Sequence, residues 1–436
     1  MKKRRGIIAT LLVIMLAMAS LSACGKKEEA ASTPTTVAEE TNDTEETKTG
    51  EEAEVTEPED VALKVWGPQE EQEILKQMCE TFDEQHPEWN ITFTYGVVAE
   101  GDAKEELLKD TEAGADVFMY ASGGTAELVA ADAIYPLTKN EEAIRAIHGE
   151  AAVAAGVVDG VLYAVPFTPN SWFMYYNKSL FTEEEVKSLD TMMAKDLGAG
   201  IKNFSCDLSN SWYLEAFFLG AGCTLFGEDG TDATSCTFNN EMGVKVGNYL
   251  LNLANSPKYS EELDGKFRSE IKEGTLAAGC SGTWDAAEIK EALGDNYGAC
   301  KLPTFTIDGT EYQLSNFADF KSIGVNTATQ YPLPAMALAE YLGGEECQKI
   351  RFEKRQVTPT ITSLASDPVV AADPATSALI LQTNFSTVQP TITQMNNYWK
   401  VAEAFGNGII NGEVTSANMQ EKLDLMVEGI LATLTE

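Results

Sequence analysis

The segment Asp116–Gly124, DVFMYASGG, decides the fold class of this chain. Its first five residues are mostly apolar and lead into Ser122-Gly123-Gly124, which is the pattern of a buried strand followed by a turn. The same alternation of strand and helix continues outward along the chain in both directions. Further strands are predicted at 63–66, 90–95, 161–166, 172–176, 275–280 and 320–325, and helices at 74–82, 102–111, 124–131, 182–196, 211–221, 240–254, 333–342, 344–355, 391–410 and 419–430. This alternation predicts an α/β fold with parallel strands, whose carboxyl ends bind ligands.

The length and net charge of the chain restrict the classes of function that it can have. The chain has 436 residues, enough for about two to three domains. It carries 68 acidic and 31 basic residues, a formal net charge of −37. A surface this acidic repels phosphate groups, so the net charge argues against nucleic-acid binding and against electrostatic docking to anionic lipid. Only two histidines are present, His86 and His148, so we expect no histidine metal site, no Ser-His-Asp triad and no cofactor.

The N-terminus predicts export and a lipid anchor. Four basic residues at positions 2–5 precede a thirteen-residue apolar run, Ile7–Ala19, which is too short to span a bilayer but fits a signal peptide. Leu21-Ser22-Ala23-Cys24 then resembles a bacterial lipobox. We therefore predict a signal peptide at 1–23 and attachment to the membrane through lipidated Cys24. The alternative is a secretory signal in which small residues happen to precede a cysteine.

Residues 24–60 are predicted to be a disordered acidic tether. They contain no aromatic residue and are rich in Asp and Glu, so they cannot bury enough apolar surface to order the chain. No later run of 18 apolar residues predicts a membrane span. The seven remaining cysteines include no C-x-x-C pair and are odd in number, so they are interpreted as buried apolar residues, with a disulfide left open.

Several segments, in this order, are typical of one family. They are Ala115–Phe118, Gly160–Pro166, Tyr176–Leu180, Lys272–Ala277, Gly282–Trp284, Lys301–Phe305, and Gln389–Met395 leading to Tyr398-Trp399. Together they resemble the family 1 extracellular solute-binding proteins of ABC sugar importers, and within that family the maltose/maltodextrin binders. The resemblance implies two α/β lobes, joined by a hinge that the chain crosses more than once, with the ligand in the cleft between them. Ligand binding would close the cleft, because contacts to both lobes exist only in the closed form.

The resemblance also implies lobe boundaries. The N-terminal lobe would comprise 61–168 and 318–372, and the C-terminal lobe 169–317 and 373–436. The chain would cross between them near 167–172, 308–317 and 371–381.

Candidate ligand-binding residues follow from the same resemblance. Flat aromatic rings stack on the C–H faces of sugars, while carboxylates and amides bind the hydroxyl groups. The matching positions give Trp399, Trp284, Trp212 and Tyr120 as aromatic residues, and Asn170, Glu70 and Asp285 as polar ones. For each ring the alternative is a role in the core, and for Asp285 it is an N-cap of a helix at 286–293.

The sequence departs from the maltodextrin pattern at two places. Ser122-Gly123-Gly124 replaces a charged Asp-Arg pair, and Glu403 stands where an arginine is expected. The exact sugar therefore stays open.

The predicted function is that of a monomeric, lipid-anchored protein on the extracytoplasmic face of the bacterial cell membrane. It would capture maltooligosaccharides and deliver them to an ABC permease without catalysing a reaction. The alternatives are binding of another oligosaccharide or of a non-sugar solute such as a polyamine, iron or a peptide, a carbohydrate-active enzyme with two facing carboxylates, and an adhesive surface lipoprotein.

Overall fold

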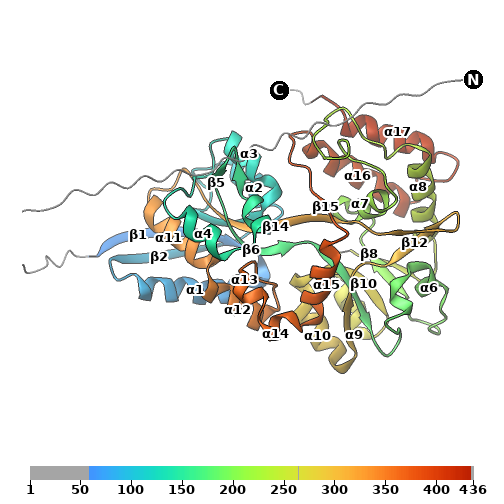
Figure 1. Cartoon of the computed structure of the whole chain (residues 1–436), viewed down its shortest axis with the longest axis horizontal. Coiled ribbons are helices and arrows are strands. Elements are labelled where there is room, and N and C mark those ends of the chain that lie inside the picture. The colour runs from blue at the N-terminus through green and yellow to red at the C-terminus, as the bar shows by residue number, and fades with distance from the viewer. Residues whose placement is uncertain (1–57, 264, 434–436) are drawn as a thin grey trace, which may run out of the picture. The chain divides into compact units, whose positions relative to one another are not determined.

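The computed structural model describes residues 58–263 and 265–433. The predicted signal peptide, Cys24 and nearly all of the acidic tether lie outside the described residues. Within them are a six-stranded and a five-stranded sheet, each with its own hydrophobic core (Figure 1). We call the elements around the first sheet the first lobe and those around the second sheet the second lobe. This arrangement confirms the predicted fold class of two α/β lobes.

The first sheet has the strand order β15-β14-β3-β1-β2, with β6 pairing β14. Its strands are β1 (Glu59–Gly67), β2 (Trp89–Val97), β3 (Val117–Ala121), β6 (Val165–Asn170), β14 (Phe317–Val325) and β15 (Thr387–Val388). Strand β1 is parallel to β2 and β3, whereas β14 is antiparallel to β3 and β6. The carboxyl ends of β1 and β3 therefore meet at one edge of the sheet.

The second sheet has the order β11-β7-β10-β8-β9. Its strands are β7 (Trp172–Asn177), β8 (Phe204–Cys206), β9 (Tyr259–Glu261), β10 (Ala278–Gly282) and β11 (Tyr297–Cys300). Two hairpins stand apart from both sheets, β4 (Val157–Val158) with β5 (Val161–Leu162) and β12 (Thr304–Ile307) with β13 (Thr310–Gln313). The hairpin of β12 and β13 was not predicted.

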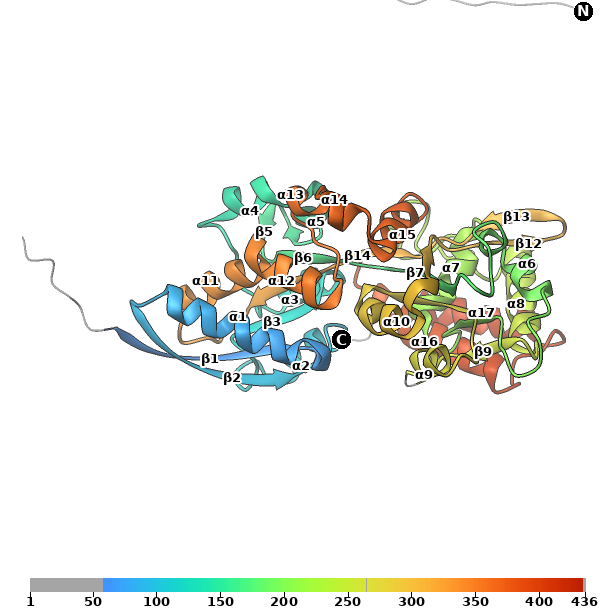
Figure 2. The ribbon, with the colours of Figure 1, turned by 90° about the horizontal axis from the view of Figure 1, so that it is seen from below.

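Helices cover both sheets (Figures 1 and 2). In the first lobe they are α1 (Gln72–Gln85), α2 (Ala103–Lys109), α3 (Thr125–Ala130), α4 (Glu141–Ile147), α5 (Glu150–Ala154), α11 (Pro332–Gly343), α12 (Glu345–Arg355) and α13 (Thr362–Ala365). In the second they are α6 (Leu189–Ala194), α7 (Ser211–Gly220), α8 (Glu241–Ala254), α9 (Lys266–Glu273), α10 (Ala286–Leu293), α15 (Pro374–Thr383), α16 (Met395–Ile410) and α17 (Met419–Ile430). The short helix α14 (Pro368–Ala371) connects α13 to α15. The predicted apolar face of α1, with Ile74, Met78 and Phe82, is buried as its four-residue spacing requires.

In the described part of the chain, the backbone passes between the lobes at five places. Strand β6 ends at Asn170 in the first sheet and β7 begins at Trp172 in the second. The chain returns into β14 at Phe317 and passes again to the second lobe between α14 and α15, where α15 packs on β7 and β11. It then enters β15 of the first sheet at Thr387 and reaches α16 of the second lobe at Met395. The first three passages lie in the regions where crossings were predicted, whereas the passages into and out of β15 were not predicted.

The buried side chain of Asn316 connects the crossings. Its Nδ2 donates to Ser171 Oγ (2.9 Å) and to the Trp172 carbonyl (2.6 Å) at the first crossing. Its Oδ1 accepts from Gln382 Nε2 (3.0 Å) at the end of α15 and from Ser386 Oγ (2.7 Å) just before β15. One amide therefore ties together three connecting segments, which are those before β7, β14 and β15.

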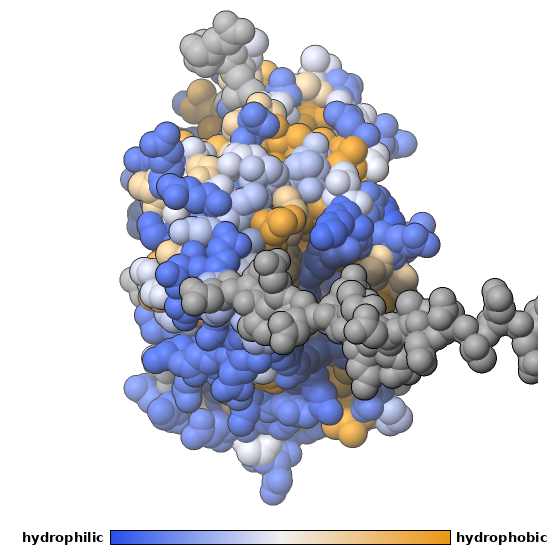
Figure 3. Space-filling model, turned by 90° about the vertical axis from the view of Figure 1, so that its left-hand side faces the viewer, coloured by the Kyte–Doolittle hydropathy of each residue, from blue (hydrophilic) through white to orange (hydrophobic). Residues whose placement is uncertain are grey.

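The face of the first lobe seen in Figure 3 is mostly hydrophilic, in keeping with the high net charge. In the described part of the chain, every helix is too short or too polar to cross a bilayer. All seven cysteines in that part are free thiols.

Candidate functional site

Two predicted tryptophans meet in the second lobe. Trp212 lies at the start of α7 and Trp399 on α16, with ring centroids 6.2 Å apart. The ring of Phe317, the first residue of β14, is 6.1 Å from each. Both tryptophans are partly exposed, whereas Phe317 is buried beneath them. We call Trp212, Trp399 and Phe317 the aromatic cluster.

Local structure fixes the two indole rings. Asn210 caps α7, its side chain accepting a hydrogen bond from the Trp212 backbone N–H at 2.9 Å. The Trp212 carbonyl accepts from Nε1 of Trp172, a fully buried residue. The hydroxyl of Tyr398 donates to the Ser211 carbonyl at 2.8 Å, which ties α16 to the first turn of α7. The pair is therefore held by the exposed cap residue Asn210 and by the buried side chains of Trp172 and Tyr398.

Trp284 lies elsewhere, in the turn after β10. Three carbons of its six-membered ring lie so close to Gly282 that any Cβ there would overlap them. Lys321 of β14 holds its Nζ over the indole, 5.1 Å from the ring centroid. Together with Thr168, Pro169 and several charged residues, these two side chains line a small cavity between the lobes.

Strand β14 links Trp284 to the aromatic cluster. Because side chains alternate along a strand, Phe317, Asp319 and Lys321 share one face of β14. Phe317 contacts Trp212 and Trp399, and Lys321 contacts Trp284. The three predicted tryptophans thus border one strip of β14 about 13 Å long.

Asn170 and Asp319 form the polar centre of this strip. The Asn170 Nδ2 donates to Asp319 Oδ2 at 3.1 Å. Burial raises the pKa of the Asp319 carboxyl to about 6, against the opposing effects of Asn170, two backbone N–H groups and Lys321. The carboxyl is therefore still ionised at neutral pH, although it is buried.

Glu70 and Asp285 approach each other from opposite lobes. Glu70 lies in the turn after β1, partly exposed and 3.7 Å from Arg355. Asp285 is buried; its carboxylate accepts from Ser281 Oγ at 2.5 Å and is 3.4 Å from Arg268. Burial raises the pKa of Asp285, and the charge of Glu70 adds a smaller contribution in the same direction. Asp285 occupies the N-cap position of α10 (Ala286–Leu293), as the alternative interpretation predicted, but its side chain makes no capping hydrogen bond.

Tyr120 lies away from the cleft surface. The side chain is fully buried in the first lobe, and its hydroxyl hydrogen-bonds Thr125 Oγ1 at 2.9 Å. Its ring packs on Phe118 with centroids 5.2 Å apart. In this arrangement Tyr120 offers no ring face to a ligand.

Sequence reasoning missed Phe317, Asp319, Lys321 and Glu100, which line or underlie the strip. The available signal was an Asp and a Lys two residues apart inside an otherwise apolar strand. Such charges need partners when buried, so their presence in a core strand indicates a site.

A polar cluster joins the lobes near the aromatic cluster. Lys104 Nζ of α2 is 2.6 Å from Glu127 Oε2 of α3, and Asn396 of α16 donates to the same oxygen at 3.1 Å. Asn396 Oδ1 also accepts from Lys104 Nζ at 3.4 Å. Asn396 precedes Trp399 by three residues, so the two share one face of α16. We call these three residues the interlobe latch.

The replacement Asn396→Ala is expected to weaken ligand binding about 3- to 10-fold, because it removes a hydrogen bond that exists only while the lobes touch. Isothermal titration calorimetry measures this change. Asn397→Ala is the matched control, since Asn397 bonds to the carbonyls of Ile430 and Ala432 within the second lobe. Equal affinities of the two variants would contradict a role for the latch.

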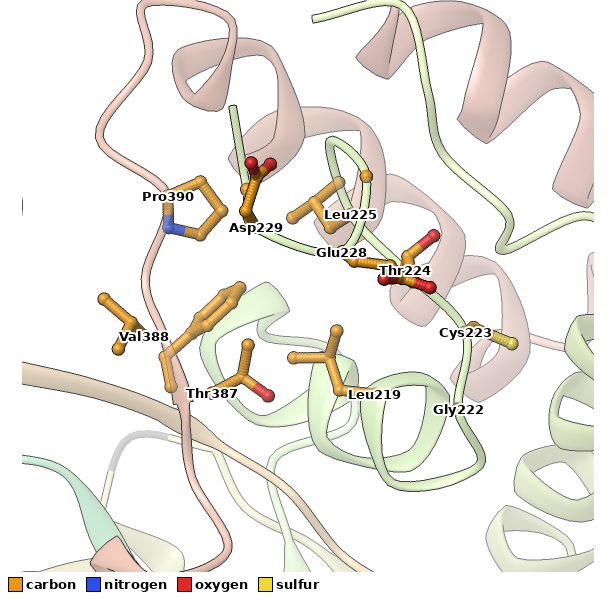
Figure 4. Close-up of a pocket in the computed structure, with 13 residues that line it drawn as sticks. Leu219, Gly222, Cys223, Thr224, Leu225, Glu228, Asp229, Thr387, Val388 and Pro390 are labelled. Atoms are coloured by element: carbon orange, nitrogen blue, oxygen red, sulfur yellow. The ribbon is translucent and has the colours of Figure 1, made fainter. Parts of the chain in front are cut away.

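A cavity of about 440 Å³ adjoins the aromatic cluster, and Phe317 forms part of its wall. Figure 4 shows apolar and polar side chains facing it from the end of α7, the loop at 222–230 and the segment around β15. Among the labelled residues are Leu219, Leu225, Asp229, Thr387, Val388 and Pro390. Its volume lies in the range of small-ligand pockets. Within residues 58–263 and 265–433 there is no cluster of three His, Cys, Asp or Glu side chains placed to hold a metal ion.

Comparisons with known proteins agree with this architecture. The family model of the bacterial extracellular solute-binding proteins matches residues 77–378. A galactooligosaccharide-binding protein of Bacillus subtilis (strain 168) is 27% identical over 382 residues, covering 84% of this chain and 88% of that protein.

Two solved structures are similar over almost their whole length. One, solved with acarbose, is 37% identical with a TM-score of 0.80 and covers 85% of this chain and 98% of its own. The other, the maltodextrin-binding protein MalE1 from L. casei BL23 without ligand, is 25% identical with a TM-score of 0.73 and covers 85% and 99%. Since the family model spans more than half of the sequence, this chain belongs to the family of bacterial extracellular solute-binding proteins.

Proposed function

We propose that this protein binds maltooligosaccharides in the cleft between its lobes and delivers them to the permease of an ABC transporter. The observation that carries the proposal is the aromatic cluster, in which two partly exposed indoles rest on a buried phenyl ring. Rings held in this way can stack on the apolar faces of glucosyl units at little cost in side-chain entropy. The similarity to proteins described with maltodextrin or acarbose supports the same ligand class.

The proposed ligand-binding residues are Trp399, Trp284, Trp212, Asn170, Glu70 and Asp285. The tryptophans would stack on sugar rings, and the polar residues would bind hydroxyl groups. The adjoining cavity of about 440 Å³ has a volume typical of small-ligand pockets and could extend the site beyond the tryptophans.

Galactooligosaccharides are a second candidate, because the Bacillus subtilis relative is named for them. Calorimetric titration with maltose, maltotriose, longer maltooligosaccharides, galactooligosaccharides, xylooligosaccharides and fructooligosaccharides tests both candidates. We expect micromolar or tighter binding of maltotriose or longer maltooligosaccharides. Binding of galactooligosaccharides alone would favour the second candidate, and no binding in the series would overturn both.

The protein is further proposed to be a monomer that changes no bond in its ligand. Analytical ultracentrifugation and thin-layer chromatography of the sugar after incubation test these two points. A dimer, or any shortened sugar, would contradict the respective point.

The proposed membrane attachment depends on Cys24 in the lipobox-like segment Leu21–Cys24. Cys24→Ser is expected to move the protein from the membrane fraction to the soluble extracytoplasmic fraction, because no acyl chain is then attached. Immunoblotting of the two fractions measures the change. Retention of the variant in the membrane fraction would contradict a lipid anchor at this residue.

A further inference from the structure

The face of β14 between the tryptophans carries two charged side chains. Asp319 and Lys321 follow Phe317 at alternate positions, so both lie on the side of the strand that bears the aromatic cluster at one end. Trp284 lies at the other end, under Lys321. Any ligand that touched all three tryptophans would lie across both charges.

The carboxylate of Asp319 is fixed by hydrogen bonds from its neighbours. It is 7% exposed, and Asn170 Nδ2 donates to its Oδ2 at 3.1 Å. The backbone N–H groups of Gly123 and Phe320 also favour its ionised form. Two carboxylate oxygens accept about four hydrogen bonds, and three donors are already present, so capacity remains for about one hydroxyl group of a ligand.

Lys321 provides donors beside this acceptor. Its Nζ is 3.2 Å from Glu100 Oε1, and the two side chains are 14% and 8% exposed. An ammonium group has three N–H donors, and Glu100 is the one carboxylate within 4 Å of it among the described residues. Lys321 and Asp319 thus place donors and acceptors side by side, which is the complement of adjacent sugar hydroxyls.

The indole of Trp284 is in contact with Gly282 and with Lys321. Gly282 lies against its six-membered ring on one side, and no larger residue would fit there. Lys321 Nζ lies over the ring at 5.1 Å, at the distance of a cation–π contact. A sugar ring that stacked on Trp284 would therefore meet the Lys321 ammonium at its edge or displace it from the indole.

From this geometry we propose that Asp319 and Lys321 are specificity-determining residues that bind hydroxyl groups of a sugar unit lying between the aromatic cluster and Trp284. This inference rests on the proposed function. It adds two charged side chains of β14 to the proposed binding site. Strand β14 begins where the chain crosses between the lobes. Buried charges are costly unless paired, and a role in ligand recognition accounts for keeping two of them here.

The test combines two isosteric variants with modified ligands. Calorimetry compares the wild-type protein, Asp319→Asn and Lys321→Met, each titrated with maltotriose and with its monodeoxy analogues, which lack one hydroxyl each. We expect each variant to bind maltotriose about 10- to 100-fold more weakly, the range for a hydrogen bond to a charged group. We also expect at least one monodeoxy analogue to bind the wild-type protein poorly. The variant should bind that analogue and maltotriose with the same affinity.

The matched control is Lys349→Met, which removes an exposed lysine of α12 that lies 4.0 Å from Glu353 on the same helix. Its affinity should equal that of the wild type. Variants that bind maltotriose within threefold of the wild type would overturn the inference, and so would a uniform loss for every analogue, which indicates an indirect effect on packing. If wild-type protein binds no oligosaccharide, the proposed function itself fails, so the two failures are distinguishable. Circular dichroism melting checks that all variants are folded.

Discussion

The Trp399→Ala variant is expected to bind its oligosaccharide roughly 2–4 kcal/mol more weakly, about a 30- to 1,000-fold rise in Kd. Trp399 is partly exposed and contacts both Trp212 and Phe317, so the variant loses a stacking surface and leaves its neighbours without support. Calorimetry or the quenching of tryptophan fluorescence by the sugar measures the change.

The control for this variant is Trp89→Ala, which removes a half-buried tryptophan of the first lobe that packs on Phe82 and His86. It should lower stability and leave affinity unchanged. A loss of binding free energy of less than about 0.5 kcal/mol in Trp399→Ala would show that the aromatic cluster is not part of the binding site.

The second large effect concerns the stability of the first lobe. Glu71 is buried in the turn after β1, with Oε1 2.6 Å from Arg351 Nε and Oε2 2.9 Å from Arg355 Nη1. Arg351 is itself fully buried and stacks on the ring of Phe167 in β6, 4.5 Å from its centroid. Glu71→Ala leaves that guanidinium without its carboxylate. We therefore expect the free energy of unfolding to fall by about 3–5 kcal/mol.

Urea unfolding followed by circular dichroism measures this loss. Glu80→Ala is the surface control, since Glu80 and Lys76 are more than 60% exposed and 3.9 Å apart. That control should change stability by less than about 0.5 kcal/mol. If Glu71→Ala is too unstable to purify, Glu71→Gln keeps the shape and one acceptor and should show an intermediate loss. Equal unfolding midpoints for Glu71→Ala and Glu80→Ala would show that the buried pair contributes nothing.

The sequence predicted the alternating framework well because hydrophobic periodicity reports burial directly. The buried face of α1 and the strand around Asp116–Ala121 could be predicted because each pattern lies within a single helix or strand. Helix α15 was missed because its segment, PATSALILQT, is apolar on most sides and shows no polar stripe. Its start was nevertheless marked by Asp373, which caps the helix, and by Pro374 at its first position.

The candidate site was predictable only in part. The positions of Trp212 and Trp399 came from a family resemblance, and their contact depends on α7 and α16, almost two hundred residues apart. Tyr120 ends a strand before a glycine-rich turn, as a cleft residue would, but its hydroxyl finds Thr125 inside the lobe. Asp319 and Lys321 were missed because a short strand pattern does not reveal which face meets another lobe.

The hydrogen bonds of Asn316 constrain how the two lobes can move relative to each other. Since one buried amide bonds to three connecting segments, these cannot bend independently without breaking its hydrogen bonds. A rotation of one lobe against the other that keeps these hydrogen bonds must therefore move the connecting segments together. A ligand that contacts both lobes would then favour the closed form only by the free energy of the contacts that exist in that form alone.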